Sequence, residues 1–351
     1  MAGNFWLSSH CEQWILDKQD ILRMRGEDLK IITEDEYTKI MIFFCNFIHA
    51  IGTDGQSQPK MRMQVIATAC VYFRRFYARR SLKDIDPFLL APTTLFLASK
   101  VEEHGMMSTS KLTTATNNAL KKWPCIQQEL VIRPQNIQEA EFILIEIMDC
   151  SLIVYHPYRY AFLIFRNILF SKPMNLMIND MKSQLIGDMK REQKDSREQR
   201  TLVNVDNKDI EALAATGWKI CNDCTRTDLS LMYPPYQIAI ACLLVASIWI
   251  NKERELKNWF AELAVDHEKI WEIMKIILNF YSIWKTFDEK EHLMPILQKM
   301  PRPSLGPQNS NGGANMIPPH SHNNLPMNGM GGHQNITMGP PQMGATSNMP
   351  H

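Results

Sequence analysis

The sequence has almost no net charge. Lys and Arg number 38 and Asp and Glu number 37, which gives a formal net charge of +1 at pH 7. Proteins that bind nucleic acid or anionic membranes largely through electrostatics carry a clear positive excess. The charge balance therefore argues against both classes, and we expect neither direct nucleic-acid binding nor membrane binding.

Long hydrophobic runs and a secretion signal are also missing. The longest apolar run extends from about Tyr236 to Ile250 and contains Gln237, and it is shorter than the roughly 20 residues that a membrane-spanning helix needs. The chain begins MAGNFWLSSHCEQW, without the basic and then apolar segment of a signal peptide. Its eight cysteines are scattered and lie mostly in apolar helical stretches, as is typical of buried thiols in a reducing compartment. We therefore expect an intracellular protein in which the apolar run is a buried core helix.

Motifs for catalysis and metal binding are absent from the sequence. It contains no phosphate-binding glycine loop, no nucleophile elbow, no paired-histidine zinc helix and no protein-kinase signature. Cys221 and Cys224 have the spacing of a redox motif, but they lie inside a helical pattern without a second pair or a preceding strand, and are better interpreted as two cysteines on one helix face. We expect no enzymatic activity, no metal site and no cofactor.

The chain does contain an internal repeat. Residues 87–99 read PFLLAPTTLFLAS and residues 235–247 read PYQIAIACLLVAS. Each copy starts with a proline suited to the first turn of a helix, continues with apolar residues at helical spacing, and ends in a small Ala-Ser pair that lets helices approach closely. The repeat predicts two related helical units, each built around a central buried helix. The copies then diverge, because Lys100 follows the first and Ile248 follows the second.

Helical periodicity extends over most of the chain and predicts an all-α fold. One N-terminal helix is expected at 8–23. The first unit is expected to contain helices at 33–51, 61–80, 87–103, 109–122 and 135–149, and the second at 158–170, 208–226, 235–251, 256–263 and 267–286. A capping box formed by Thr33 and Glu36 marks the start of the first of these. Four arginines, Arg74, Arg75, Arg79 and Arg80, are interpreted as favourable charges at a helix C-terminus.

These patterns divide the chain into an N-terminal arm and helix at 1–30, a first five-helix unit at 31–153, a second at 154–299 and a tail at 300–351. The second unit is interrupted at about 173–207 by a charge-dense stretch that includes KREQKDSREQR, which is interpreted as a solvated loop or a loose exposed helix. The tail is rich in Pro, Gly, Asn and Met. We expect it to be disordered, because it cannot bury enough apolar surface to offset its ordering entropy.

Two charged residues interrupt apolar helix faces in the first unit. Lys100 lies at helical spacing from Phe96, and Glu141 from Ile137 and Leu144. Opposite charges in apolar surroundings on neighbouring helices are typical of a surface that binds a partner, where they fix the register. The alternative is a pair of surface charges, or an intrachain salt bridge of little consequence.

The same residues carry a resemblance to the cyclin family. LASKVEE ends the first repeat helix, and a glutamate in the fifth helix follows about forty residues later, as in the cyclin box. Further strings are similar to the cyclin C group of that family: QWILDKQD, SLKDIDP, IVYHPYR, YPP, WFAEL and KTFDEKE. The resemblance covers roughly residues 1–170 and 208–300.

This resemblance implies a non-catalytic activator of a cyclin-dependent kinase. Lys100 and Glu141 would be the polar anchors for the regulatory helix of the kinase, and Val101, Ile145 and Leu152 would add apolar contact around them. The kinase would be the one associated with the Mediator complex, and the partners would include the other subunits of the Mediator kinase module. The protein would then regulate RNA polymerase II transcription in the nucleus.

Two further interpretations concern other partners. Cyclin-box proteins of the general transcription machinery bridge DNA and polymerase factors without a kinase and usually carry a strong basic face, and the net charge of +1 argues against this alternative. The helix expected to end near residue 51 lacks the MRAIL-type motif that docks substrate Arg-x-Leu peptides in cell-cycle cyclins, so we do not expect substrate recruitment by that route.

A second binding groove is predicted around Trp6, Trp218, Asn222 and Asp223. The last three residues lie at helical spacing, and Trp6 lies in the N-terminal arm. Tryptophans beside polar groups are typical anchors of protein interfaces. In the alternative interpretation Trp218 is a core residue and Asn222 caps locally.

Overall fold

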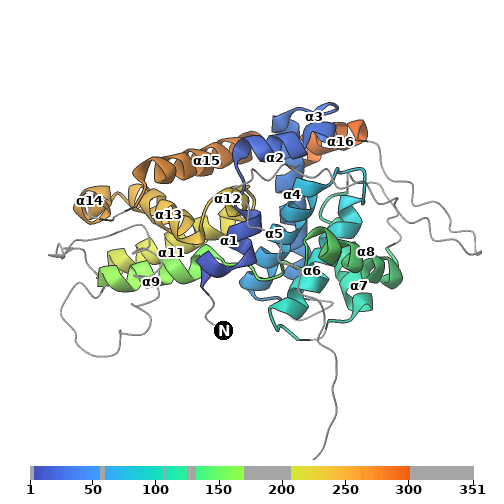
Figure 1. The fold of residues 1–351 in the computed structure, drawn as a ribbon, viewed down its shortest axis with the longest axis horizontal. Helices are drawn as coiled ribbons and strands as arrows, with labels where there is room; N and C mark the ends of the chain where they lie inside the picture. The colour runs from blue at the N-terminus through green and yellow to red at the C-terminus, as the bar shows by residue number, and fades with distance from the viewer. Residues whose placement is uncertain are drawn as a thin grey trace, which may run out of the picture. The chain divides into compact units, whose positions relative to one another are not determined.

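The computed structural model describes residues 4–55, 60–105, 107–124, 126, 132–169, 207–261, 263 and 265–300. These residues form an all-helical fold without strands, as predicted from the periodicity (Figure 1), and they all belong to one unit, Met1–Ser304. The predicted disorder of residues 301–351 lies outside the described residues, as does the charged stretch predicted at 173–207, apart from its last residue.

The first helical unit, which we call the first box, contains the five helices that were predicted. They are α4 (Glu34–Gly52), α5 (Met63–Arg79), α6 (Pro87–Val101), α7 (Thr109–Leu120) and α8 (Pro134–Ile147). The predicted capping box opens α4: Glu36 N–H donates to Thr33 Oγ1 at 3.2 Å, and Thr33 N–H donates to Glu36 Oε2 at 3.0 Å. Helix α6 is central and contacts each of the other four helices.

The second unit, the second box, repeats this arrangement. Its helices are α9 (Pro157–Leu169), α11 (Asn207–Cys224), α13 (Pro235–Trp249), α14 (Glu253–Ala261) and α15 (His267–Thr286). Helix α13, the second copy of the sequence repeat, is central and packs against α9, α11, α14 and α15. Cys221 and Cys224 are buried thiols in the core of this box, on the face of α11, as predicted.

The repeat extends to the backbone where the two central helices end. Glu103 and Asn251 occupy the same place in the two copies, and both have left-handed backbones, with φ of 51° and 56°. Beyond them, His104 N–H donates to Ser99 O at 2.9 Å, and Lys252 N–H donates to Ser247 O at 2.8 Å. These bonds close both helices in the same way, since a left-handed residue lets the chain turn back onto the last carbonyls. The two boxes can therefore be compared residue by residue at this position.

The prediction of one N-terminal helix at 8–23 is wrong. The arm forms four short pieces: η1 (Phe5–Leu7), α1 (Ser9–Trp14), α2 (Lys18–Met24) and α3 (Gly26–Leu29). The helix breaks after Trp14, where Leu16 N–H donates to Leu231 O in the second box at 2.7 Å. Because the Leu16 amide donates to the second box, it does not form the hydrogen bond that would continue the helix. Attachment to the second box therefore overrides the local periodicity.

Two helices beyond the N-terminal arm were not predicted from the sequence. Helix α12 (Leu229–Met232) is a single turn, and α16 (Glu289–Lys299) follows α15. In Figure 1 the chain runs along α15 away from the second box and reaches α16 beside the first box. Helix α16 packs on α4 and buries Leu293, Ile296 and Leu297 in the core of the first box. The sequence of α4 gave no reason to expect that substrates dock on this helix. Part of α4 is also covered by α16.

An ion cluster with two buried arginines joins the arm to both boxes. Arg25 donates two hydrogen bonds to the carboxylate of Asp228, at 2.7 and 2.9 Å, and Arg74 of α5 donates a third at 2.7 Å. Burial alone would raise the pKa of Asp228, but the two guanidinium groups outweigh it and hold that pKa well below its usual range. Of the four arginines interpreted as charges at a helix C-terminus, only Arg79 lies in the last turn of α5. Arg74 and Arg75 lie further inside the helix and are buried, and Arg75 donates to Ser151 O at 2.7 Å.

Candidate partner-binding site

Lys100 and Glu141 meet on the surface of the first box, where α6 and α8 pack side by side. Lys100 Nζ lies 2.5 Å from Glu141 Oε1 and 4.3 Å from the centre of the Phe96 ring. The side chain of Lys100 is 46% exposed, whereas that of Glu141 is only 9% exposed. The ammonium group can therefore be reached by a partner, while the carboxylate is held beneath it.

The helix pattern explains why Glu141 is in this position. The buried face of α8 is formed by Ile137, Ala140, Glu141 and Leu144, so the carboxylate takes a place that otherwise belongs to apolar side chains. Burial of a carboxylate is costly unless it is paired. Lys100 supplies the pairing charge from the last turn of α6, where a cation is also favoured by the helix dipole.

Three apolar residues were also predicted for this site. Val101, Ile145 and Leu152 are partly buried and pack against the core of the first box. The backbone of Leu152 is fixed by Tyr72, whose hydroxyl donates to Leu152 O at 2.5 Å. The structure thus brings Lys100 and Glu141 together, and Val101, Ile145 and Leu152 each leave part of their apolar surface open.

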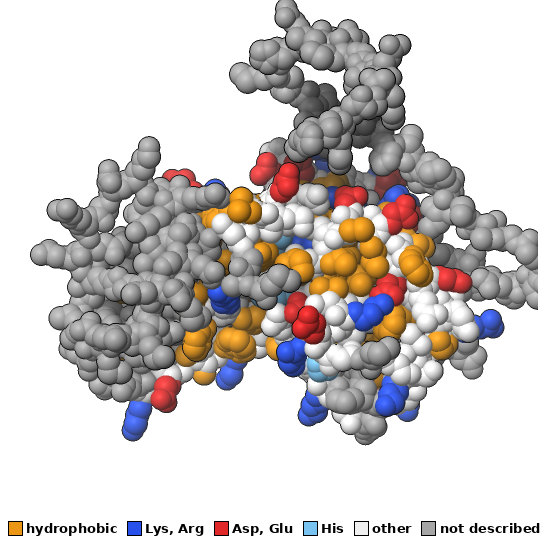
Figure 2. Space-filling view, turned by 60° about the horizontal axis from the view of Figure 1, so that its bottom comes forward, with side chains coloured by type: hydrophobic (Ala, Val, Ile, Leu, Met, Phe, Trp, Pro, Cys, Tyr) orange, Lys and Arg blue, Asp and Glu red, His pale blue; other side chains and the backbone are white. Residues whose placement is uncertain are grey.

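Sequence reasoning missed two exposed apolar residues in the same segments. Phe142 is 75% exposed and Ile153 is 59% exposed. Phe142 directly follows Glu141 but is not on the buried face of α8. An apolar residue at this outward position of the helix is the sequence feature from which its exposure could have been predicted. Figure 2 shows hydrophobic side chains gathered on the half of the molecule that carries the first box, with acidic and basic side chains at the border. We call the surface formed by Lys100, Val101, Glu141, Phe142, Ile145, Leu152 and Ile153 the α6–α8 face.

The α6–α8 face has the chemistry of a protein-binding surface. It offers one accessible cation, a buried carboxylate and exposed apolar groups, which can bind the apolar side of a helix and fix its register. Among the residues that the structure describes, no cluster of His, Cys, Asp and Glu could hold a metal ion. Within the same ranges, no helix is long and apolar enough to cross a membrane.

The tryptophans of the second predicted groove have separate surroundings. Trp6 lies in η1 with its ring 6.1 Å from the ring of Tyr236, at the start of α13. Trp218 lies on α11, 4.7 Å from the ring of Tyr158, and remains 41% exposed. Trp218 is therefore an exposed aromatic residue and not a core residue.

Of the two polar residues of that groove, Asp223 is hydrogen-bonded within the second box, whereas the side-chain oxygen of Asn222 is buried and accepts no hydrogen bond from the described residues. Asp223 accepts hydrogen bonds from the hydroxyl of Tyr281 at 2.8 Å and from Arg226 at 3.2 Å. The backbone carbonyl of Asn222 accepts the hydroxyl of Thr225 at 2.7 Å. The carboxylate of Asp223 thus faces α15, while Trp6 packs on the start of α13.

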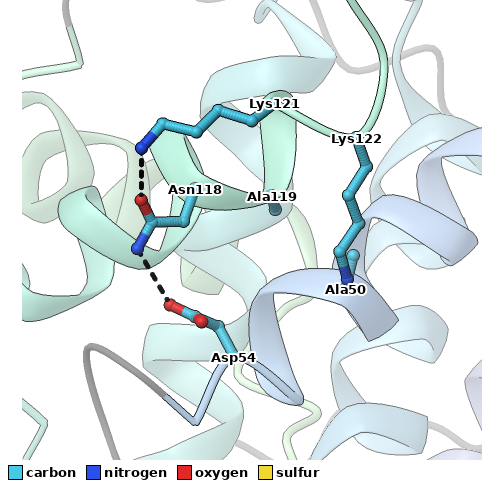
Figure 3. A pocket seen from close by; sticks show the side chains of 6 residues that line it. All are labelled: Ala50, Asp54, Asn118, Ala119, Lys121 and Lys122. Atoms are coloured by element: carbon cyan, nitrogen blue, oxygen red, sulfur yellow. Dashed lines mark hydrogen bonds between the residues drawn. The ribbon is translucent and has the colours of Figure 1, made fainter.

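A small hollow lies between the ends of α4 and α7 (Figure 3). Its volume is about 260 Å³, and it is lined by Ala50, Asp54, Asn118, Ala119, Lys121 and Lys122. Lys121 donates to Asn118 at 3.0 Å, and Asn118 donates to Asp54 at 3.4 Å, as the dashed lines in Figure 3 show. These bonds link α4 to α7, so we interpret the hollow as a joint between helices.

A larger groove of about 830 Å³ separates α4 from the link between α15 and α16. Polar groups along it also pair with each other. Asn46 accepts a hydrogen bond from Arg226 at 2.7 Å and donates one to Glu289 at 2.5 Å, and the indole N–H of Trp123 donates to Glu289 at 2.6 Å. These bonds hold α16 against the first box.

Comparison with known proteins identifies both boxes. A sequence model of the N-terminal domain of cyclins matches residues 53–152, and a model of a cyclin C-terminal domain matches residues 172–298. Cyclin-C of Drosophila melanogaster is 46% identical over 310 residues, which cover 88% of this chain and 100% of the relative. Cyclin-C of Rattus norvegicus is 45% identical over 322 residues, which cover 90% and 98%.

Solved structures share the fold at low sequence identity. A chain in the CAK complex from Chaetomium thermophilum bound to ATP-gamma-S has a TM-score of 0.58 and 19% identity, with 84% of this chain and 87% of that chain covered. A chain in the yeast TFIIK (Kin28/Ccl1/Tfb3) complex has a TM-score of 0.54 and 22% identity, with 78% and 100% covered.

Proposed function

Because the chain belongs to the cyclin family, we propose that it is a non-catalytic regulatory subunit that binds and activates a cyclin-dependent kinase. The observation that carries this proposal is the α6–α8 face, where an accessible lysine pairs with a buried glutamate among exposed apolar side chains. The structural similarity to chains in the CAK and TFIIK complexes agrees with the fold that this function needs.

The α6–α8 face would act by positioning a helix of the kinase. Phe142 and Ile153 would contact the apolar side of that helix, and Lys100 would donate a hydrogen bond to a carboxylate or carbonyl oxygen of the helix while keeping its contact with Glu141. In protein kinases an ion pair between a strand lysine and a glutamate of the regulatory helix must form before phosphoryl transfer. A helix held on this face would be fixed in the orientation that allows that pair, so activation would require no chemistry from this chain.

The finer assignment rests on the relatives. They are named Cyclin-C and are 45–46% identical to the chain over nearly their whole length. We propose that the kinase is the one associated with the Mediator complex, that other subunits of the Mediator kinase module bind the same assembly, and that the assembly regulates RNA polymerase II transcription in the nucleus. The groove around Trp6, Trp218, Asn222 and Asp223 stays a prediction for a second partner in that module.

Replacement of Lys100 by Glu tests the kinase contact. The variant places two carboxylates together and removes the accessible cation, so we expect co-purification with the Mediator-associated kinase to fall at least tenfold. Lys111→Glu on α7 is the matched control, because Lys111 is an exposed lysine of the same box outside the α6–α8 face, and it should leave binding unchanged.

A second variant separates binding from folding. Phe142→Ser removes a side chain that is 75% exposed, so the helical circular dichroism should be retained while kinase binding is reduced. Retention of full kinase binding by both Lys100→Glu and Phe142→Ser would overturn the proposed contact.

A further inference from the structure

The second box has a face that corresponds to the α6–α8 face of the first. The sequence repeat pairs α6 with α13, and the two helices end with the same backbone geometry at Glu103 and Asn251. Counting back from these ends pairs Lys100 with Ile248 and Val101 with Trp249.

The second helix of the face corresponds as well. The buried positions of α15 have the same spacing as those of α8: Ile137, Ala140, Glu141 and Leu144 match Ile270, Ile273, Met274 and Ile277. Met274 thus takes the place of Glu141, and Leu278 takes the place of Ile145. Since α13 packs against α15 as α6 packs against α8, the two boxes present equivalent surfaces.

The charge pair is replaced by apolar groups in the second box. Ile248 and Met274 stand where Lys100 and Glu141 form their ion pair, and Met274 is buried. Four apolar side chains of the two helices are exposed: Ile248 (45%), Trp249 (47%), Trp271 (58%) and Leu278 (50%). The ring of Trp249 lies 4.9 Å from that of Tyr281, which joins the end of α13 to α15. We call this surface the α13–α15 face.

An exposed group of this kind is uncommon on a protein that acts alone. Large apolar patches on soluble proteins mark binding sites, and tryptophan is the residue most enriched among the energetic centres of interfaces. Trp271 and Leu278 lie two turns apart on one side of α15, with Lys275 between them. Lys275 forms no ion pair with any of the residues that the structure describes, so its charge is available to a carboxylate of a partner.

We propose that the α13–α15 face binds an amphipathic helix of a partner protein, with leucine-like side chains toward Trp249, Trp271 and Leu278 and an acidic residue beside Lys275. The proposal rests on the proposed function in one respect: as on the α6–α8 face, the bound segment is a helix that lies across two packed helices. The occupant differs from the kinase helix, because the central ion pair that would recognise the latter is missing here.

A designed peptide tests the face directly. The probe is a fluorescein-labelled 18-residue peptide in which leucines are spaced alternately three and four residues apart and all other residues are glutamate. Its binding to the full chain is measured by fluorescence anisotropy. Saturable binding is expected, and Trp271→Ala and Leu278→Ala should each raise the Kd about tenfold. Lys275→Glu should raise it as well, and a matched peptide with lysine in place of glutamate should bind more weakly than the acidic one.

Controls locate the site within the molecule. Phe162 on α9 is 58% exposed, as Trp271 is, so Phe162→Ala removes the same exposed fraction elsewhere in the second box and should leave the Kd unchanged. Lys100→Glu should weaken kinase binding and leave the peptide Kd unchanged, whereas Trp271→Ala should leave kinase binding unchanged and raise the peptide Kd. No saturable binding, an unchanged Kd in both α15 variants, or loss of the peptide in Lys100→Glu would overturn the proposal.

Discussion

Asp228 is the residue at which three parts of the chain meet. Arg25 reaches it from the N-terminal arm and Arg74 from the first box, while Asp228 itself belongs to the second box. The guanidinium group of Arg25 also lies over the ring of Tyr37, 4.6 Å from its centre. Removal of one partner from a buried ion pair is strongly destabilising, because the charge left behind is uncompensated.

The variant Asp228→Asn is expected to lower the free energy of unfolding by about 3 kcal/mol, because two buried arginines lose their counter-charge. Urea unfolding at pH 7 measures the change. Asp209→Asn is the control, since Asp209 also pairs with a cation, Lys252 at 2.7 Å, but both side chains are about one-third exposed. A partly exposed pair contributes about 1 kcal/mol or less, so equal losses in the two variants would contradict the role given to Asp228.

Acid sensitivity is expected from three histidines. Burial lowers the pKa of His10, His49 and His156 to about 3, with further lowering by Arg75 for His10 and His156 and by Arg226 for His49. Because each pKa is lower in the folded than in the unfolded state, the unfolded chain binds more protons below about pH 6.5. The free energy of unfolding should therefore fall as the pH is lowered from about 6.5 toward 3, by roughly 2–3 kcal/mol per histidine at pH 4.5.

Urea unfolding at pH 7.5, 6.0 and 4.5 tests this dependence. His156→Gln keeps a polar side chain beside Thr68, which lies 2.7 Å from His156 Nε2, but it removes one titrating group. The decline in stability between pH 7.5 and 4.5 should become smaller in this variant. A wild-type stability that does not change over this range would show that the histidines do not control it.

At the scale of elements, α16 is expected to stabilise the box that it packs on. Leu293 is fully buried against the first core, so Leu293→Ala should cost about 2–5 kcal/mol. Hydrogen exchange should accelerate in α4, which α16 contacts. Glu291→Ala, an exposed position on the same helix, is the control and should change neither quantity, and unchanged exchange in α4 after Leu293→Ala would contradict this packing.

Local signals predicted some elements well and could not predict others. The capping box of Thr33 and the proline starts of the repeat helices lie within the segments that they organise, so α4, α6 and α13 were found from sequence. The break after Trp14 depends on a hydrogen bond from Leu16 to Leu231, more than 200 residues away. No local periodicity contains that information.

The candidate site shows the same division. Lys100 and Glu141 were found because charge on an apolar stripe is a local anomaly, and the structure brings them to 2.5 Å. The burial of Arg74 and Arg75 was not predicted, because a basic helix end has the same sequence whether its arginines are solvated or buried. The sequence contains no feature that distinguishes Arg74, which pairs with Asp228, from an exposed arginine.

At the scale of the whole molecule, the two boxes are linked strongly enough to unfold together. The links are the ion cluster at Asp228, the hydrogen bond from Leu16 to Leu231 and the packing of α16 on α4. We expect a single transition in urea, with coincident curves from tryptophan fluorescence and far-ultraviolet circular dichroism. Two separate transitions in the wild-type chain would show that these links do not couple the boxes.

The position of α16 has a consequence for the two copies of the repeat. The second copy ends in a helix that has no counterpart in the first, and this helix returns to cover the outer side of the first copy. The two boxes are therefore not interchangeable, because part of the first box is covered by α16, a helix that follows the second box in the chain. Without α16, the first box would expose the apolar flank that Leu293, Ile296 and Leu297 now cover.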